Sequence, residues 1–266
     1  LKVIEKVNGK KKMRKFLKRS LDEYLTSRTF ESKRENALMY NDGQGYIRYQ
    51  KGSLIFYALS DYIGEKKLNK ALRKYVEKVA FQEPPYTTTI DLVNHVKEVT
   101  PDSLNYLIKD MFETITLYQN KIVSTESKKL ENGKYQVDIE FKVSKYRNDE
   151  KGKIFYGDQE RDSISFKTEE MKKPEYSVFL SDYVDVGIFG EEDDKETELY
   201  LKKHKISSIN NKVSIIVDKE PIEVGIDPYN KLIDTNSEDN RKKINQEILT
   251  DKNGGLKKVP EYTSSL

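Results

Sequence analysis

Two tyrosines, Tyr46 and Tyr49, are the residues of this sequence best suited to carry chemistry. They lie in a stretch flanked by Gly45 and Gly52, and the apolar run of residues 53–59 follows at once. Glycine permits close backbone approach and a buried helix gives rigidity, so the pattern predicts a loop that aims two phenols at one point. A phenol keeps its proton to about pH 10 and can donate a hydrogen bond to an oxyanion. On spacing alone, however, the favoured interpretation is that both tyrosines anchor the loop on the helical core.

Other groups that commonly catalyse reactions or bind metals are few. The only histidines are His95, in a predicted helix, and His204, among lysines at the end of a predicted strand. His95 has Glu98 three positions later but no histidine four positions later, so it is not part of an HExxH zinc-binding pair. Both histidines are therefore predicted to be surface or structural residues.

The remaining motifs of catalysis are also missing from the sequence. The chain has no cysteine, which excludes a disulfide framework, a thiolate metal ligand and a thiol nucleophile. It contains no glycine-rich phosphate loop, serine nucleophile elbow or aspartate-rich calcium loop. By itself, the sequence therefore shows no complete catalytic apparatus.

Composition indicates a globular protein with modest cores and a highly charged surface. Of the 266 residues, 36% are hydrophobic, 35% are charged and 11% are aromatic. The net charge of +3 is too small to indicate a nucleic-acid or membrane surface. Residues 2–19 hold nine Lys or Arg and one acid, which we interpret as the solvated face of a helix.

The first residues suggest a longer polypeptide. The sequence starts with Leu1 and enters a helix-like pattern directly, without a signal peptide, so we expect the chain to be a piece of something longer. No run approaches the roughly 18 apolar residues that a membrane-spanning helix needs.

The first part of the chain has helical periodicity. An amphipathic stripe predicts a helix over 11–28, a loop is expected over 29–45, and a buried helix should run from residue 53 to a stop at Gly64. A helix over 67–79 is followed by a break at Pro84 and Pro85. Thr88 and Asp91 form a capping-box pattern for a helix to Val99, and Thr100 is expected to cap a last helix that includes Ile115.

Near Lys121 the apolar period changes from 3.6 to 2. Residues 135–143 alternate strictly between apolar and polar, and similar short runs follow around 164–166, 184–188, 199–201, 213–217 and 222–226. This pattern predicts a β-sandwich of roughly seven strands. The expected organisation is a helical part over 1–121, a β-sandwich over 122–238 and a polar tail over 239–266, which gives an α+β fold class.

Several stretches carry a family resemblance. Tyr49-Gln50-Lys51-Gly52 resembles the Tyr-x-Lys-Gly element of gluzincin zinc aminopeptidases, the membrane alanyl aminopeptidase and leukotriene hydrolase family (metallopeptidase family M-one). The rest is similar to a bacterial branch in which such a peptidase is fused to an ABC-type permease. The stretches that support it are MRKFL (13–17), YIRY (46–49), FQEPPY (81–86), DMFETITLY (110–118), DVGIF (185–189) and GIDPYNKLID (225–234).

The resemblance implies a role for one residue and a dependence on others. In the family, the tyrosine that corresponds to Tyr49 donates a hydrogen bond to the tetrahedral intermediate, so Tyr49 is the expected catalytic position. Tyr46 is a candidate neighbour without a motif of its own, and Lys51 and Gly52 are expected to shape the turn. The HExxH, its general base, the third zinc ligand and the Gly-x-Met-x-Asn element are absent here; in the family they lie upstream. No cofactor is therefore expected in this chain, and zinc is implied only for the full-length parent.

Three functions follow as hypotheses. The first is that the chain is the C-terminal part of a zinc aminopeptidase, inactive alone, whose partners are the upstream zinc-binding domain of the same polypeptide and a peptide substrate. The second is a non-catalytic binding or assembly module of a degenerate peptidase attached to an ABC-type transporter. The third is a free-standing peptide-binding sandwich protein. The very apolar helix after Gly52 argues against it, because such a helix is expected to need neighbours on several sides. The expected location is a soluble portion of a membrane-attached bacterial protein, on a side that the sequence does not indicate; no nucleic-acid partner and no membrane span are expected.

Overall fold

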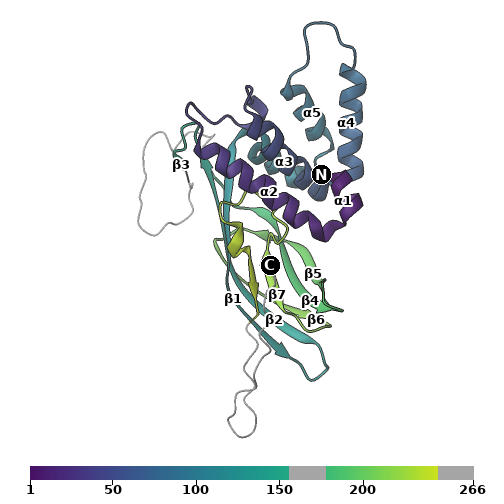
Figure 1. Ribbon diagram of the computed structural model, residues 1–266, viewed down its shortest axis with the longest axis vertical. Helices are drawn as coiled ribbons and strands as arrows, with labels where there is room; N and C mark the ends of the chain where they lie inside the picture. Colours follow the sequence, from purple (N-terminus) through teal and green to yellow (C-terminus); the bar gives the residue numbers. More distant parts are fainter. Residues whose placement is uncertain (156–177, 245–266) are drawn as a thin grey trace.

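The chain folds into a helical segment followed by two antiparallel sheets (Figure 1). The computed structural model describes residues 1–155 and 178–244. The helices are α1 (Lys2–Asn8), α2 (Lys10–Thr29), α3 (Gly52–Leu59), α4 (Glu65–Val79), α5 (Thr89–Val99) and α6 (Asn105–Ile108). Short 3-10 or π-helical turns are η1 (Leu38–Tyr40), η2 (Ile47–Lys51), η3 (Ser60–Gly64), η4 (Asp102–Leu104), η5 (Lys109–Glu113) and η8 (Ser237–Asn240). The predicted α+β fold class is confirmed.

Helix α2 forms where the apolar stripe predicts it. Met13, Leu17, Leu21 and Tyr24 recur at helical spacing and are all fully buried. They pack with Leu54 of α3 and with residues at the start of the sheets in one apolar cluster. Helix α2 thereby supports the segment that carries the two tyrosines.

Residues 45–64 form a nearly continuous helix, and the predicted glycine-flanked loop is wrong. The helix already includes Gly45 and Tyr46, passes through η2 and continues as α3 and η3. Gly52 has helical angles, with φ −58° and ψ −42°, so it does not shape a turn. Burial decided the outcome, because Ile47 and Leu54 are fully buried and only a helix brings both to the core. Gly64, with φ 93°, does end the helix as predicted.

The later helices confirm one predicted cap and correct another. Thr88 and Asp91 form the expected capping box at the start of α5. Thr100 does not cap a following helix, since its hydroxyl donates to the Val96 carbonyl of α5 at 2.8 Å. The last helical turn, η5, ends at Glu113, and Ile115 begins a strand instead of ending a helix. The helix-to-strand change therefore precedes the predicted position near Lys121.

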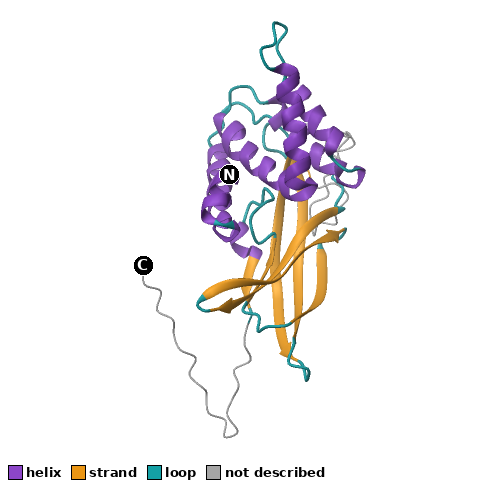
Figure 2. Cartoon of the chain, turned by 90° about the vertical axis from the view of Figure 1, so that its right-hand side faces the viewer, coloured by secondary structure: helices purple, strands orange, loops and turns teal. Residues whose placement is uncertain are grey.

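The two sheets form a sandwich with a shared core (Figure 2). The first sheet contains β1 (Ile115–Lys129), β2 (Tyr135–Asn148), β3 (Ile154–Phe155) and β6 (Asn210–Val217). The second has the order β5 (Lys195–Ile206), β4 (Asp182–Glu192), β7 (Glu223–Ile226) and β8 (Arg241–Lys243). Alternate residues of β2, such as Val137 and Ile139, join Val186 and Ile188 of β4 in one buried cluster. The strand expected around 164–166 lies outside the described residues.

The first residues of the predicted tail belong to the fold. Strand β8 pairs with β7 through Arg241 and Gly225, and Asn240 is fully buried. The prediction of a tail from residue 239 is therefore wrong for residues 239–244. Residues 245–266 lie outside the described part of the chain.

Two glycines explain why the sheets tolerate a proline above them. Gly187 of β4 and Gly225 of β7 are directly paired across the sheet. A Cβ atom on Gly225 would lie 2.8 Å from Cβ of Pro228, and one on Gly187 would lie 3.1 Å from its Cγ. The absence of side chains at both positions thus leaves room for Pro228.

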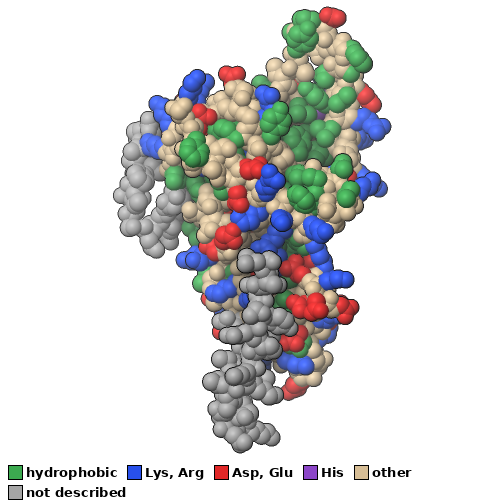
Figure 3. Space-filling view, in the orientation of Figure 1, with side chains coloured by type: hydrophobic (Ala, Val, Ile, Leu, Met, Phe, Trp, Pro, Cys, Tyr) green, Lys and Arg blue, Asp and Glu red, His purple; other side chains and the backbone are tan. Residues whose placement is uncertain are grey.

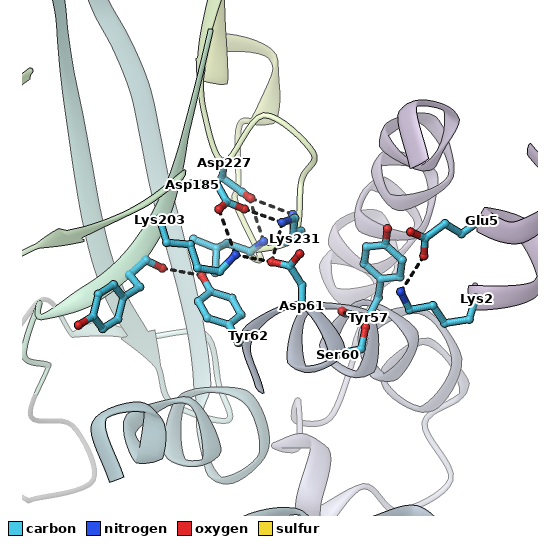
Figure 4. Close-up of polar contacts among 12 residues, drawn as sticks. Lys2, Glu5, Tyr57, Ser60, Asp61, Tyr62, Asp185, Lys203, Asp227 and Lys231 are labelled. Carbon is cyan, nitrogen blue, oxygen red and sulfur yellow. Dashed lines mark hydrogen bonds and ion pairs between the residues drawn. The ribbon is translucent and has the colours of Figure 1, made fainter. Parts of the chain in front are cut away.

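Buried and half-buried ion pairs fasten the helical segment to the sheets. Asp61 of η3 pairs with Lys203 of β5 and with Lys231 at 2.7 Å (Figure 4). Both lysines also bind Asp185 of β4, at 3.0 and 2.5 Å.

A second cluster of ion pairs also joins the helical segment to the sheets. It is centred on Asp110 of η5, shortly before the start of β1. Lys145 of β2 lies between Asp110 of η5, at 2.9 Å, and Asp182 of β4, at 2.8 Å. Arg147 also binds Asp110, at 2.5 Å. Because a buried charge is costly without its partner, these pairs favour one relative position of helices and sheets.

Candidate functional site

The two tyrosines lie in one helical segment but have different surroundings. Tyr46 directly precedes η2, and Tyr49 lies within this π-helical turn. Single π-helical turns are frequent at functional sites. The Tyr46 ring packs on Tyr24 and its hydroxyl binds Glu31, whereas Tyr49 is largely exposed, so the two phenols do not converge on one point as the sequence suggested.

Tyr49 projects into solvent. Its side chain is 66% exposed, and within the described part of the chain its hydroxyl makes no hydrogen bond. The Arg48 guanidinium lies 6.0 Å from the centre of its ring. The turn beneath Tyr49 is held by fully buried neighbours, Ile47 and Leu54. The structure thus presents one free phenol on a rigid base.

Tyr46 is a supporting residue. Its hydroxyl donates to Oε2 of Glu31 at 3.3 Å, and its ring stacks on Tyr24 with centres 6.0 Å apart. Burial, followed by the nearby Glu35 and Glu31, raises the pKa of Tyr46. The phenol therefore stays protonated and is already committed to a partner.

Beneath Tyr46 lies a buried charge cluster that the sequence did not reveal. Glu35 accepts hydrogen bonds from the Tyr24 hydroxyl and from Arg28, whose Nε and Nη2 lie 2.8 and 2.7 Å from Oε2. Burial, with the neighbouring Glu35 second, raises the pKa of Tyr24. This cluster joins α2 to the segment before η1.

Lys51 is the most unusual residue of the site. It is 1% exposed, and its Nζ has no hydrogen-bond partner among the described residues. Its Nζ lies over the face of the Tyr24 ring, 5.3 Å from the ring centre. Burial lowers the pKa of Lys51 to about 8, although Glu35 raises it in part. The site therefore contains a buried cation without a bonded counter-charge.

A pattern in the sequence points to Lys51. Ile47, Lys51, Ile55 and Ala58 follow the spacing i, i+4, i+8 and i+11, which is one face of a helix. The stripe indicates burial of Lys51 only where residues 45–52 are helical, and the predicted loop excluded that. Glu35, by contrast, lies in irregular structure, where no periodicity can indicate burial.

A surface pocket of about 400 Å³ opens beside this cluster. It lies between the segment of Glu35 and Tyr40 and the ends of β1 and β2, and Tyr49 is not among its described lining residues. Its described polar lining includes Arg34, Glu113 and Asp149. The pocket and the exposed phenol are thus separate features.

Both histidines are structural, as predicted. His95 places Nδ1 2.7 Å from the Asp91 carbonyl of its own helix, which requires Nδ1 to be the donor, and packs edge-on against Tyr75. His204 places Nε2 2.8 Å from the Tyr200 hydroxyl, and burial followed by Lys202 lowers its pKa. No group of three or more His, Cys, Asp or Glu among the described residues is arranged to hold a metal ion. These residues therefore do not fit a zinc site.

Comparisons with known proteins add no family. No protein-family model matches the chain, and no curated protein matches it. Among the described residues, no helix has the length and apolar character needed to cross a membrane.

Proposed function

We propose that this chain supplies the oxyanion-stabilising tyrosine of a zinc aminopeptidase-like protein. Tyr49 donates a hydrogen bond to the oxygen that becomes negative when a peptide carbonyl is attacked. The observation that carries the proposal is an exposed phenol with no partner among the described residues, fixed on a rigid helical turn. A donor held in place before the reaction needs no reorganisation when the charge develops.

The phenol suits this task chemically. At neutral pH a tyrosine is protonated, so it can donate a hydrogen bond but does not compete for a metal as an anion. One oxyanion donor contributes about 3 to 4 kcal/mol to transition-state stabilisation. Tyr46 does not share the role, since its hydroxyl is held by Glu31.

The metal and base belong, in this proposal, to another segment of the same polypeptide. The described residues offer no metal group, so we assign no zinc ligand here. In isolation, the chain should then show no aminopeptidase activity. Activity of residues 1–266 that a chelator removes would overturn this division of the site.

The decisive test is Tyr49→Phe in the full-length polypeptide. Removal of the hydroxyl should lower kcat by roughly 10² to 10³ and leave KM nearly unchanged, since the contact is made in the transition state. Tyr46→Phe is the matched control, because it removes a hydroxyl three residues away that is already bound to Glu31. We expect it to change kcat much less.

An unchanged kcat in Tyr49→Phe would return Tyr49 to a structural role. If the full-length polypeptide also lacked activity, the alternative would be favoured, in which the chain is a binding or assembly module of a degenerate peptidase attached to an ABC-type transporter. Binding of zinc to the full-length polypeptide, measured directly, separates a degenerate peptidase from an active one.

A further inference from the structure

The hairpin of α4 and α5 ends in an exposed apolar tip. Residues 80–88 connect the two helices, and every residue from 80 to 86 is exposed. Phe81 is 103% exposed and Tyr86 is 72% exposed, and Val76 and Ile90 add 57% and 46% exposed side chains on the adjoining helical turns. Figures 1 and 2 show this loop at the end of the molecule away from the strand hairpins, and Figure 3 shows hydrophobic side chains gathered there. We call Val76, Phe81, Tyr86 and Ile90 the apolar tip.

Phe81 occupies its position at a conformational cost. Its φ of 60° lies in the left-handed region, where glycine is favoured and a bulky residue is an outlier. The side chain gains no packing in return, because it is fully exposed. Folding of the described chain therefore gives no reason for phenylalanine at this position, and an apolar contact outside the chain does.

The helix that leads to the tip is basic. Helix α4 has six Lys or Arg and two Glu in its 15 residues. Its apolar face is buried through Leu68 and Ala71, which leaves the charged face in solvent. Lys70, Arg73 and Lys78 form no ion pair within the described residues. Residues 80–86 of the connecting loop carry one charge, Glu83.

We propose that the apolar tip inserts into the interface of a lipid bilayer with anionic headgroups. Phe81 and Tyr86 enter the boundary between headgroups and acyl chains, where aromatic rings are favoured, and the lysines of α4 contact the headgroups. Shape favours a membrane over a protein partner, because the tip is a protruding extremity that a broad, soft surface can reach as a whole. Charge favours anionic lipid, since each basic residue near such a surface is attracted to it.

Co-sedimentation with vesicles tests the proposal on the whole 266-residue chain. We expect binding to phosphatidylcholine vesicles that contain phosphatidylserine, with weaker binding to phosphatidylcholine alone and a loss on addition of salt. Phe81→Gly should reduce the partition constant by roughly tenfold or more, because most of a phenylalanine's apolar surface no longer leaves water. Lys70→Glu with Lys78→Glu should abolish the preference for phosphatidylserine.

The chosen substitution protects the test from misfolding. Glycine is favoured at φ 60°, so Phe81→Gly should fold at least as stably as the wild type, which far-UV circular dichroism and urea unfolding check. Phe179→Ser is the control, since Phe179 is also exposed, by 75%, but lies in the segment that leads into β4 (Asp182–Glu192) of the sandwich. It should leave vesicle binding unchanged.

Absence of vesicle binding would overturn the proposal and leave a protein surface as the occupant of the tip. So would unchanged binding by Phe81→Gly, or an equal loss in Phe179→Ser. No readout involves peptide hydrolysis, so this result and the test of Tyr49 are independent.

Discussion

Lys51 gives the sharpest physical test of this structure. Replacing it by methionine removes the ammonium but keeps an unbranched side chain of similar length. The folded state lowers the Lys51 pKa from 10.5 to about 8, which corresponds to a cost of roughly 3 kcal/mol for holding the charged form. At pH 7 the lysine is protonated in both the folded and the unfolded chain, so wild type bears the full cost. Lys51→Met should therefore be more stable than wild type by about 3 kcal/mol at pH 7.

The pH dependence follows from the sign of the shift. The folded-state pKa lies below the unfolded value, so the folded chain releases its proton first as pH rises. Wild type regains stability between pH 8 and 10.5, and the advantage of Lys51→Met should fall to about 1 kcal/mol at pH 10. Urea unfolding of both proteins at pH 7 and pH 10 measures this difference. Titration of other tyrosines and lysines is common to both proteins and cancels in the comparison.

Lys145→Met is the matched control. Lys145 is likewise buried, at 2% exposed, and lies over a tyrosine ring, but it binds Asp110 and Asp182. Its removal leaves the buried Asp182 carboxylate without a cation and Asp110 with Arg147 alone, so this variant should lose about 3 to 5 kcal/mol at pH 7. The reasoning about Lys51 would be refuted if Lys51→Met were destabilised at pH 7, or if its difference from wild type were equal at both pH values.

Two further predictions concern the joint and the sandwich. Lys231→Met removes the ammonium shared by Asp61 and Asp185. Because Lys203 still contacts both carboxylates, we expect a loss of stability near the lower end of about 3 to 5 kcal/mol in urea unfolding. A change below about 1 kcal/mol would show that the cluster does not hold the helices to the sheets. Gly225→Ala places a Cβ 2.8 Å from Pro228 and 3.0 Å from Arg241, so it should cost about 1 to 3 kcal/mol. Gly45→Ala meets nothing within 4 Å and lies in a helix, so it should be neutral or stabilising by up to about 1 kcal/mol. A destabilised Gly45→Ala would instead favour a loop at that position.

Local patterns in the sequence were sufficient for most elements. The stripe through Met13, Leu17 and Leu21 defines α2 because its period and its burial agree. Thr88 and Asp91 define the start of α5 because both partners of a capping box lie within four residues. The alternation in 135–143 defines β2 because one of its faces is buried in the sandwich.

The errors occurred where distant contacts outweighed local signals. Gly45 and Gly52 suggested a loop, but burial of the apolar face of residues 47–58 makes the segment helical. Residues 239–244 read as a polar tail, yet β8 completes a sheet whose partner strand is some twenty residues earlier in the chain. Neither result can be read from a window of neighbouring residues, because the stabilising contacts are remote in sequence.

For the site, the sequence alone determined the residue types and their spacing: two phenols three positions apart, a lysine two positions later and no metal-binding set. Tertiary structure alone decided what each of them does. Packing of residues 45–59 against α2 turns Tyr46 onto Tyr24 and Glu31, leaves Tyr49 in solvent and buries Lys51 without a bonded counter-charge. The reason is that the exposure of each side chain on this helix depends on the elements packed around it, such as Tyr24 of α2, and the local sequence does not specify those neighbours.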